Sequence, residues 1–96
     1  MEDLETLRAR IDALDEQLLA LLNERASCAL AVAETKLAES GDVAPVFYRP
    51  EREAQVLRKM MQRNPGPLSG EKVALVFRQI MSACLALEEP LTVAYL

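Results

Sequence analysis

Four ionisable residues of this chain occupy positions where helical patterns predict apolar side chains. Glu88 ends a run of apolar residues spaced by three and four, and Glu53 lies on the apolar line of another predicted helix. Arg25 interrupts a leucine-rich pattern, and Lys36 follows it by three helical turns with a drift of about 20°. Because an unpaired charge in an apolar environment costs several kcal/mol, these side chains need partners.

Each of these residues has a simpler explanation when it is taken alone. Arg25 could pair with a glutamate and set the register of a helical dimer. Lys36 and Glu53 each suit the nearest helix dipole, and Glu88 could reach water beside Pro90. Together, inward polar groups on three helices, with two cations among them, predict a small anion-binding cavity inside a bundle. Arginine pairs with carboxylates through two parallel hydrogen bonds, so a carboxylated ligand is expected.

Arg8 is a further candidate for binding that ligand. It lies seventeen residues before Arg25, which is about 25 Å along one helix. Arg8 therefore cannot readily reach the ligand of its own chain. In an antiparallel or intertwined dimer, Arg8 of the second chain could reach it.

A long helix is predicted over about 3–38, and it carries Arg8, Arg25 and Lys36. Apolar residues recur there at spacings of three and four, with one seven-residue step at Arg25: Leu4, Leu7, Ile11, Leu14, Leu18, Leu21, Cys28 and Val32. Such a helix is about 54 Å long, whereas a compact domain of this size has a radius of gyration of about 12 Å. The helix must protrude, and its apolar face needs a second chain.

Two further helices are expected. One begins at Pro50, which suits a first helical turn, and ends at the turn-forming sequence NPGP of 64–67. The other spans about 70–89, with Ser69 as its cap and Pro90 as its stop. The apolar, β-branched tail 91–96 is predicted to be a strand with no partner in this chain. We therefore expect one all-α domain over 1–90, and a linker or the start of another domain over 91–96.

Composition narrows the class of protein. The 96 residues suit one domain, and 51% apolar residues with only 4% aromatic ones are typical of packed helices. A net charge of −4 without a basic run argues against nucleic acid and anionic membranes as partners. Cys28 and Cys84 have no metal-binding spacing and histidine is absent, so no metal site is expected. Reduced thiols and a charged N-terminus favour a cytoplasmic protein.

The sequence resembles the all-helical chorismate mutases, and among them the N-terminal mutase domains of bifunctional chorismate mutase–prephenate dehydratases. The resemblance covers nearly the whole chain, in LRARIDALDEQLLALLNER (7–25), Lys36, VFYRPERE (46–53) and FRQIMSACLALEEPL (77–91). The tail PLTVAYL (90–96) resembles the link to the dehydratase domain and its first strand. The resemblance implies that a dehydratase domain follows in the full-length protein and that this chain lacks dehydratase activity.

The fold implied by the resemblance is an intertwined homodimer of three-helix chains, one helix being very long, with two equivalent sites. The implied reaction converts chorismate to prephenate in phenylalanine biosynthesis. Arg8 from the partner chain and Arg25 are implied to hold the two substrate carboxylates. Arg52 is implied to support the carboxylate end.

The remaining implied roles concern the ether oxygen and the ring hydroxyl. Lys36 is implied to reach the ether oxygen and a carboxylate, and Glu88 to contact that oxygen from the other side. Glu53 is implied to accept a hydrogen bond from the hydroxyl. Cys84 is also predicted to bind the substrate, at a position where some relatives carry serine. Residues 48–50 lie where the best-known version of the family pattern has an aspartate.

The implied rearrangement is unimolecular and pericyclic, so neither a nucleophile nor a cofactor is expected. Catalysis would come from restricting the substrate conformation and from stabilising charge on the ether oxygen, with Arg25, Lys36 and Glu88 as the catalytic set. Glu88 can donate only when protonated, and we predict a raised pKa for it in the complex.

Two rival functions remain. An isochorismate–pyruvate lyase on the same scaffold would also bind an enolpyruvyl ether. A non-catalytic helical dimerisation module would explain the long apolar pattern but not the inward charges.

Overall fold

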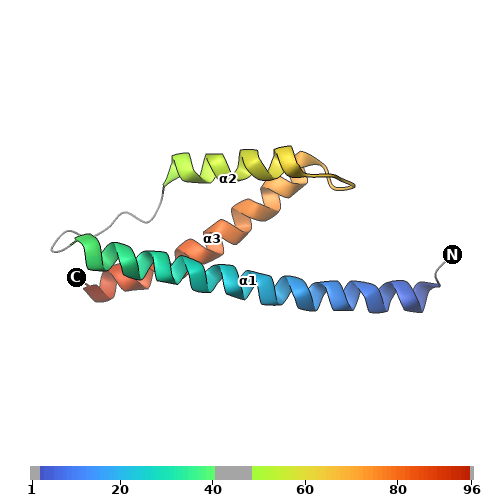
Figure 1. Cartoon of the computed structure of the whole chain (residues 1–96), viewed down its shortest axis with the longest axis horizontal. Coiled ribbons are helices and arrows are strands. Elements are labelled where there is room, and N and C mark those ends of the chain that lie inside the picture. The colour runs from blue at the N-terminus through green and yellow to red at the C-terminus, as the bar shows by residue number, and fades with distance from the viewer. Residues whose placement is uncertain (1–2, 41–48, 96) are drawn as a thin grey trace.

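The computed structural model describes residues 3–40 and 49–95, and these form three helices without a strand. They are α1 (Leu4–Ser40), α2 (Pro50–Arg63) and α3 (Gly70–Tyr95), arranged as in Figure 1. The bounds of α1 and α2 lie within two residues of the predicted ones. The loop predicted around Gly41 and Pro45 lies outside the described residues.

Helix α1 protrudes from the rest of the chain, as predicted. The molecule measures 61 × 25 × 15 Å, and Figure 1 shows the N-terminal part of α1 extending beyond α2 and α3. Asp3 caps the helix, because its Oδ1 accepts a hydrogen bond of 2.8 Å from the backbone N–H of Thr6. This bond lowers the pKa of the Asp3 carboxyl. Every residue from 3 to 24 is exposed in the single chain.

Helix α3 packs against both other helices and links them. It starts beside the end of α2 and crosses to the C-terminal half of α1 (Figure 1). Only four of the described residues with assigned burial are buried: Ala33, Leu57, Ala74 and Cys84. No large side chain among them is fully buried. The core of the single chain is therefore small for its apolar content.

The connection between α2 and α3 follows the predicted turn chemistry. The side-chain amide of Asn64 donates to the carbonyl of Leu68 at 2.6 Å, and its Oδ1 accepts from the backbone N–H of Gly66 at 3.1 Å. Gly66 has a φ of 81°, which glycine adopts without a Cβ clash. Ser69 caps α3, because its Oγ accepts a bond of 3.2 Å from the N–H of Lys72.

The prediction that Pro90 ends the third helix and that a strand follows is wrong for 91–95. Helix α3 continues through Pro90 to Tyr95. Proline removes one intrahelical hydrogen bond and crowds the preceding turn. A strand without a neighbouring strand would make no backbone hydrogen bonds within the chain, whereas a continued helix makes them within itself. The division into a domain of 1–90 and a following segment stays a prediction.

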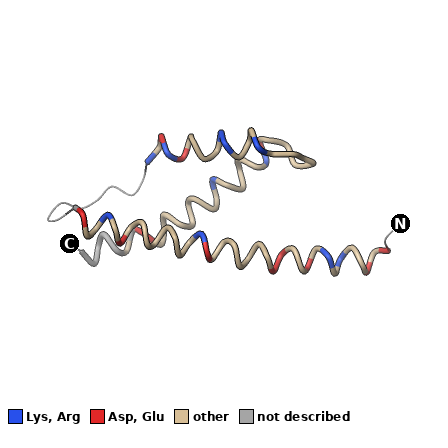
Figure 2. Tube along the Cα trace, in the orientation of Figure 1, with Lys and Arg blue, Asp and Glu red and all other residues tan. Residues whose placement is uncertain are grey.

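Charge is spread along the helices. Figure 2 shows basic and acidic residues interspersed on α1 and α2, with no long stretch of one sign in the described residues. Within those residues, no helix combines the length and the apolar composition needed to cross a membrane.

Candidate active site

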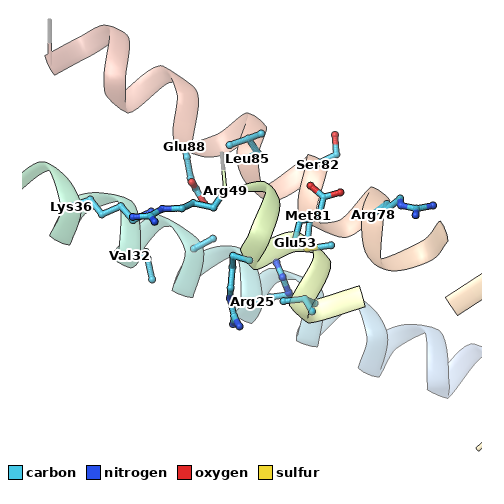
Figure 3. Close-up of a pocket in the computed structure, with 13 residues that line it drawn as sticks. Arg25, Val32, Lys36, Arg49, Glu53, Arg78, Met81, Ser82, Leu85 and Glu88 are labelled. Atoms are coloured by element: carbon cyan, nitrogen blue, oxygen red, sulfur yellow. The ribbon is translucent and has the colours of Figure 1, made fainter. Parts of the chain in front are cut away.

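A cavity of about 470 Å³ opens between the three helices, within the size range of small-molecule sites. Its lining comes from all three helices and from Arg49 just before α2 (Figure 3). The lining residues are Arg25, Ala29, Val32 and Lys36, then Arg49, Arg52, Glu53 and Val56, then Arg78, Met81, Ser82, Leu85 and Glu88. The cavity therefore contains five cationic and two acidic side chains.

Helix α1 contributes its two predicted cations from one face. Arg25, Ala29, Val32 and Lys36 follow at steps of four, three and four residues, so they line the cavity in a row. Arg25 and Lys36 are partly buried. The short side chains of Ala29 and Val32 lie between the two cations and leave room for a ligand.

The first turn of α2 contributes one carboxylate and one cation. Glu53 is partly buried and Arg52 is exposed, and both line the cavity. Pro50 is the first residue of the helix, a position that suits the fixed φ of proline. The backbone N–H of Glu53 donates to the carbonyl of Arg49 at 3.0 Å, which is the first hydrogen bond of this helix.

Helix α3 brings Glu88 to the end of the cavity occupied by Lys36 (Figure 3). Partial burial raises the pKa of the Glu88 carboxyl, and the positive charges of Lys36 and Arg25 oppose this rise without cancelling it. Folding therefore shifts the Glu88 carboxyl toward its neutral form. When protonated, it can donate a hydrogen bond to an acceptor in the cavity.

Cys84 lies beside the cavity and contacts Arg25. The Nη1 of Arg25 donates to the Cys84 Sγ at 3.1 Å. Cys84 is buried and is absent from the cavity lining. It lines instead an apolar groove of about 730 Å³ between α1 and α3. Its predicted contact with a substrate stays a prediction, whereas its contact with Arg25 comes from the structure.

The structure thus brings together five of the seven predicted site residues in the cavity: Arg25, Lys36, Arg52, Glu53 and Glu88. Cys84 supports one of them from outside. Arg8 lies far along the exposed half of α1 and does not line the cavity. This location agrees with the expectation that Arg8 cannot serve the site of its own chain.

Three polar residues that line the cavity were not among the predicted site residues: Arg49, Arg78 and Ser82. Counting from Glu88 through Leu85 in steps of three and four would have found the two on α3. The apolar run that the sequence pattern gives before Glu88 passes instead through Cys84, on the neighbouring face of α3. Arg49 lies before its helix begins, so no helical period could have indicated it.

The described residues form three helices around a cavity that is lined mainly by cationic side chains. The chorismate mutase type II family model matches residues 7–89, so the chain belongs to that family and is a chorismate mutase domain. The family predicted from the sequence motifs is therefore confirmed, as is the all-helical fold.

Curated relatives agree with this membership. The chain is 62% identical to a bifunctional chorismate mutase/prephenate dehydratase of Pseudomonas aeruginosa, over 99% of this chain and 26% of the relative. It is 56% identical to a protein of the same description from Stutzerimonas stutzeri, with the same coverage. The chain spans about a quarter of the length of these curated relatives.

Two solved structures share the fold. Chorismate mutase (Form II) from Thermus thermophilus matches with a TM-score of 0.83 and 32% identity, over 92% of this chain and 96% of that one. Chorismate mutase from Helicobacter pylori, solved in complex with prephenate, matches with a TM-score of 0.77 and 33% identity, over 97% of this chain and 96% of that one.

Proposed function

We propose that this domain rearranges chorismate to prephenate in the cavity between α1, α2 and α3. The observation that carries the proposal is the convergence of Arg25, Lys36 and a Glu88 of raised pKa on one cavity of suitable size. Membership of the chorismate mutase type II family supports the same reaction. The solved relative from Helicobacter pylori, in complex with prephenate, supports prephenate as the product.

The first contribution to catalysis is conformational. The enolpyruvyl arm of chorismate must fold over the ring before the new carbon–carbon bond can form, and holding both carboxylates restricts the arm to that geometry. Arg25 holds one carboxylate from α1, Arg8 of a partner chain holds the other, and Arg52 supports the carboxylate end. Glu53 accepts a hydrogen bond from the ring hydroxyl.

The second contribution is electrostatic. As the carbon–oxygen bond breaks, negative charge develops on the ether oxygen, and fixed donors in a sheltered cavity stabilise that charge. Lys36 donates from α1, and protonated Glu88 donates from α3. A single donor of this kind is typically worth about 3 kcal/mol of the activation barrier. The rearrangement moves electron pairs within one molecule, so the mechanism uses no nucleophile and no cofactor.

The site is completed by a second copy of the chain. Six apolar residues on one face of α1, from Leu4 to Leu21, are between 41% and 60% exposed in the single chain. The apolar groove between α1 and α3 adds further exposed apolar side chains of α1, Leu19 and Leu22. An intertwined homodimer would bury both surfaces and bring the partner's Arg8 to the cavity.

Incubation of the purified chain with chorismate and, separately, with isochorismate tests the reaction. We expect prephenate from chorismate and no pyruvate from isochorismate. Release of pyruvate from isochorismate, with chorismate left intact, would identify a lyase on this scaffold. Inertness toward both substrates would favour a dimerisation module.

The cellular setting follows from the relatives. Their bifunctional description supports a prephenate dehydratase domain after this one in the full-length protein, and thus a place in phenylalanine biosynthesis. The expected cytoplasmic location and the absence of dehydratase activity from this chain stay predictions.

A further inference from the structure

The cavity carries more positive charge than the roles proposed above require. Five cationic side chains line it against two carboxylates, whereas chorismate brings two negative charges. Arg49 and Arg78 are the two cations without a role. Arg78 points away from the end of the cavity that Lys36 and Glu88 share (Figure 3), so Arg49 is the cation to explain.

Arg49 reaches the functional end of the cavity. Figure 3 shows its side chain extending toward that of Lys36, and both residues line the cavity together with Glu88. Like charges that approach each other in a cavity repel unless an anion lies near both. With Glu51, the partner of Arg49, counted in, the cavity and its rim hold five cationic side chains against three carboxylates, so positive charge is in excess. This end of the cavity therefore suits an added carboxylate.

Arg49 is also held in a way that leaves its guanidinium available. Its backbone is anchored, because its carbonyl accepts the N–H of Glu53 at 3.0 Å and Pro50 follows. Its Nη1 lies 3.6 Å from the Oε1 of Glu51, in an ion pair whose side chains are 56% and 69% exposed. Exposed pairs of this kind contribute little free energy. A ligand carboxylate can replace Glu51 at small cost.

We propose that Arg49 is a further substrate-binding residue, which exchanges the Glu51 carboxylate for a carboxylate of the bound dianion beside Lys36. The inference rests on the proposed function, because it takes chorismate as the ligand. Arg49 contacts the same carboxylate in substrate and transition state, so it contributes to binding rather than to the chemical step.

Steady-state kinetics of three variants test the role of Arg49. Arg49→Ala is expected to raise the KM for chorismate about tenfold with kcat within about twofold of the parent, because uniform binding is lost. Arg49→Lys should give an intermediate KM, since the charge remains and the two-point contact is lost. Glu51→Gln should lower KM, because it releases Arg49 from its competing partner.

A double variant separates this role from a structural one. If Glu51 acts through Arg49, Glu51→Gln should have no effect on KM in the Arg49→Ala background. If the pair only stabilised the start of α2, Arg49→Ala and Glu51→Gln would change KM in the same direction, which would overturn the inference. Arg58→Ala is the matched control, because Arg58 is an exposed cation of α2 outside the cavity lining.

The inference is also overturned if Arg49→Ala leaves KM within about twofold of the parent, or if Arg58→Ala raises it equally. Failure of the proposed function has a different signature, which is absence of turnover in the parent. In that case calorimetric titration with prephenate tests Arg49. Weaker binding by Arg49→Ala alone supports its role, and equal binding by all variants, or none by the parent, contradicts it.

Discussion

The guanidinium of Arg25 and the thiol of Cys84 are joined by a hydrogen bond of 3.1 Å that links α1 to α3. Arg25 lines the cavity, whereas Cys84 is buried outside its lining. The thiol thus occupies one donor of the guanidinium, and the remaining donors are left for a ligand. The direction of Arg25 therefore depends on a residue of a different helix.

Substitution of Cys84 should reduce turnover through Arg25. Cys84→Ala removes the acceptor and is expected to lower kcat/KM about fivefold, which corresponds to about 1 kcal/mol for a neutral acceptor. Cys84→Ser keeps an acceptor and should stay close to the parent. Cys28→Ala is the control, since Cys28 is exposed. Equal kinetics for the alanine and serine variants at position 84 would contradict the positioning role.

The pH dependence of turnover should report Glu88. Its pKa is raised by partial burial, so the donor form is populated below that pKa and is lost as pH rises through it. We expect kcat/KM to fall over this range, and Glu88→Gln to give a flatter profile because its amide donates at every pH. The same sign holds for stability, since the neutral carboxyl is favoured in the folded chain and that contribution disappears at higher pH.

Initial rates across the pH range, with Glu71→Gln as the control, check this prediction. Glu71 is an exposed carboxylate in the first turn of α3, outside the cavity. A Glu88→Gln profile as steep as that of the parent would show that another group titrates.

Mixing two inactive variants should restore activity if Arg8 serves the site of its partner. In a dimer of one Arg8→Ala chain and one Arg25→Ala chain, one site would have both arginines and the other would have neither. After subunit exchange, half of the dimers are mixed, so about a quarter of the parent activity is expected. Recovery far below this value, with exchange verified by mass spectrometry, would exclude donation of Arg8 across the interface.

The exposed apolar face of α1 should hold the dimer together. Ile11→Glu places a charge on this face, where Ile11 is 55% exposed in the single chain. We expect the variant to sediment as a monomer and to lose turnover, because a buried unpaired charge is costly. Ala9→Glu adds the same charge on the opposite face of the helix and should remain dimeric. A dimeric, active Ile11→Glu variant would locate the interface elsewhere.

The helices could be predicted from the sequence where their apolar pattern was regular. The period of α1 and the turn residues around α2 predicted their bounds, whereas Pro90 misled, because proline weakens a helix without always ending it. Arg25, Lys36 and Glu88 were found because charges on apolar faces are anomalous. Arg49 had no such signal, because a polar residue before a helix is ordinary.

The most direct measurement is the loss of chorismate absorbance with the purified chain and with its Arg25→Ala variant. Arg25 lines the cavity, donates a hydrogen bond to the thiol of Cys84 and is the last residue of the family motif at 7–25. We expect rapid loss of absorbance with prephenate as the product, and a kcat/KM lower by several orders of magnitude in the variant. No loss of absorbance with the parent chain, or near-normal turnover by Arg25→Ala, would contradict it.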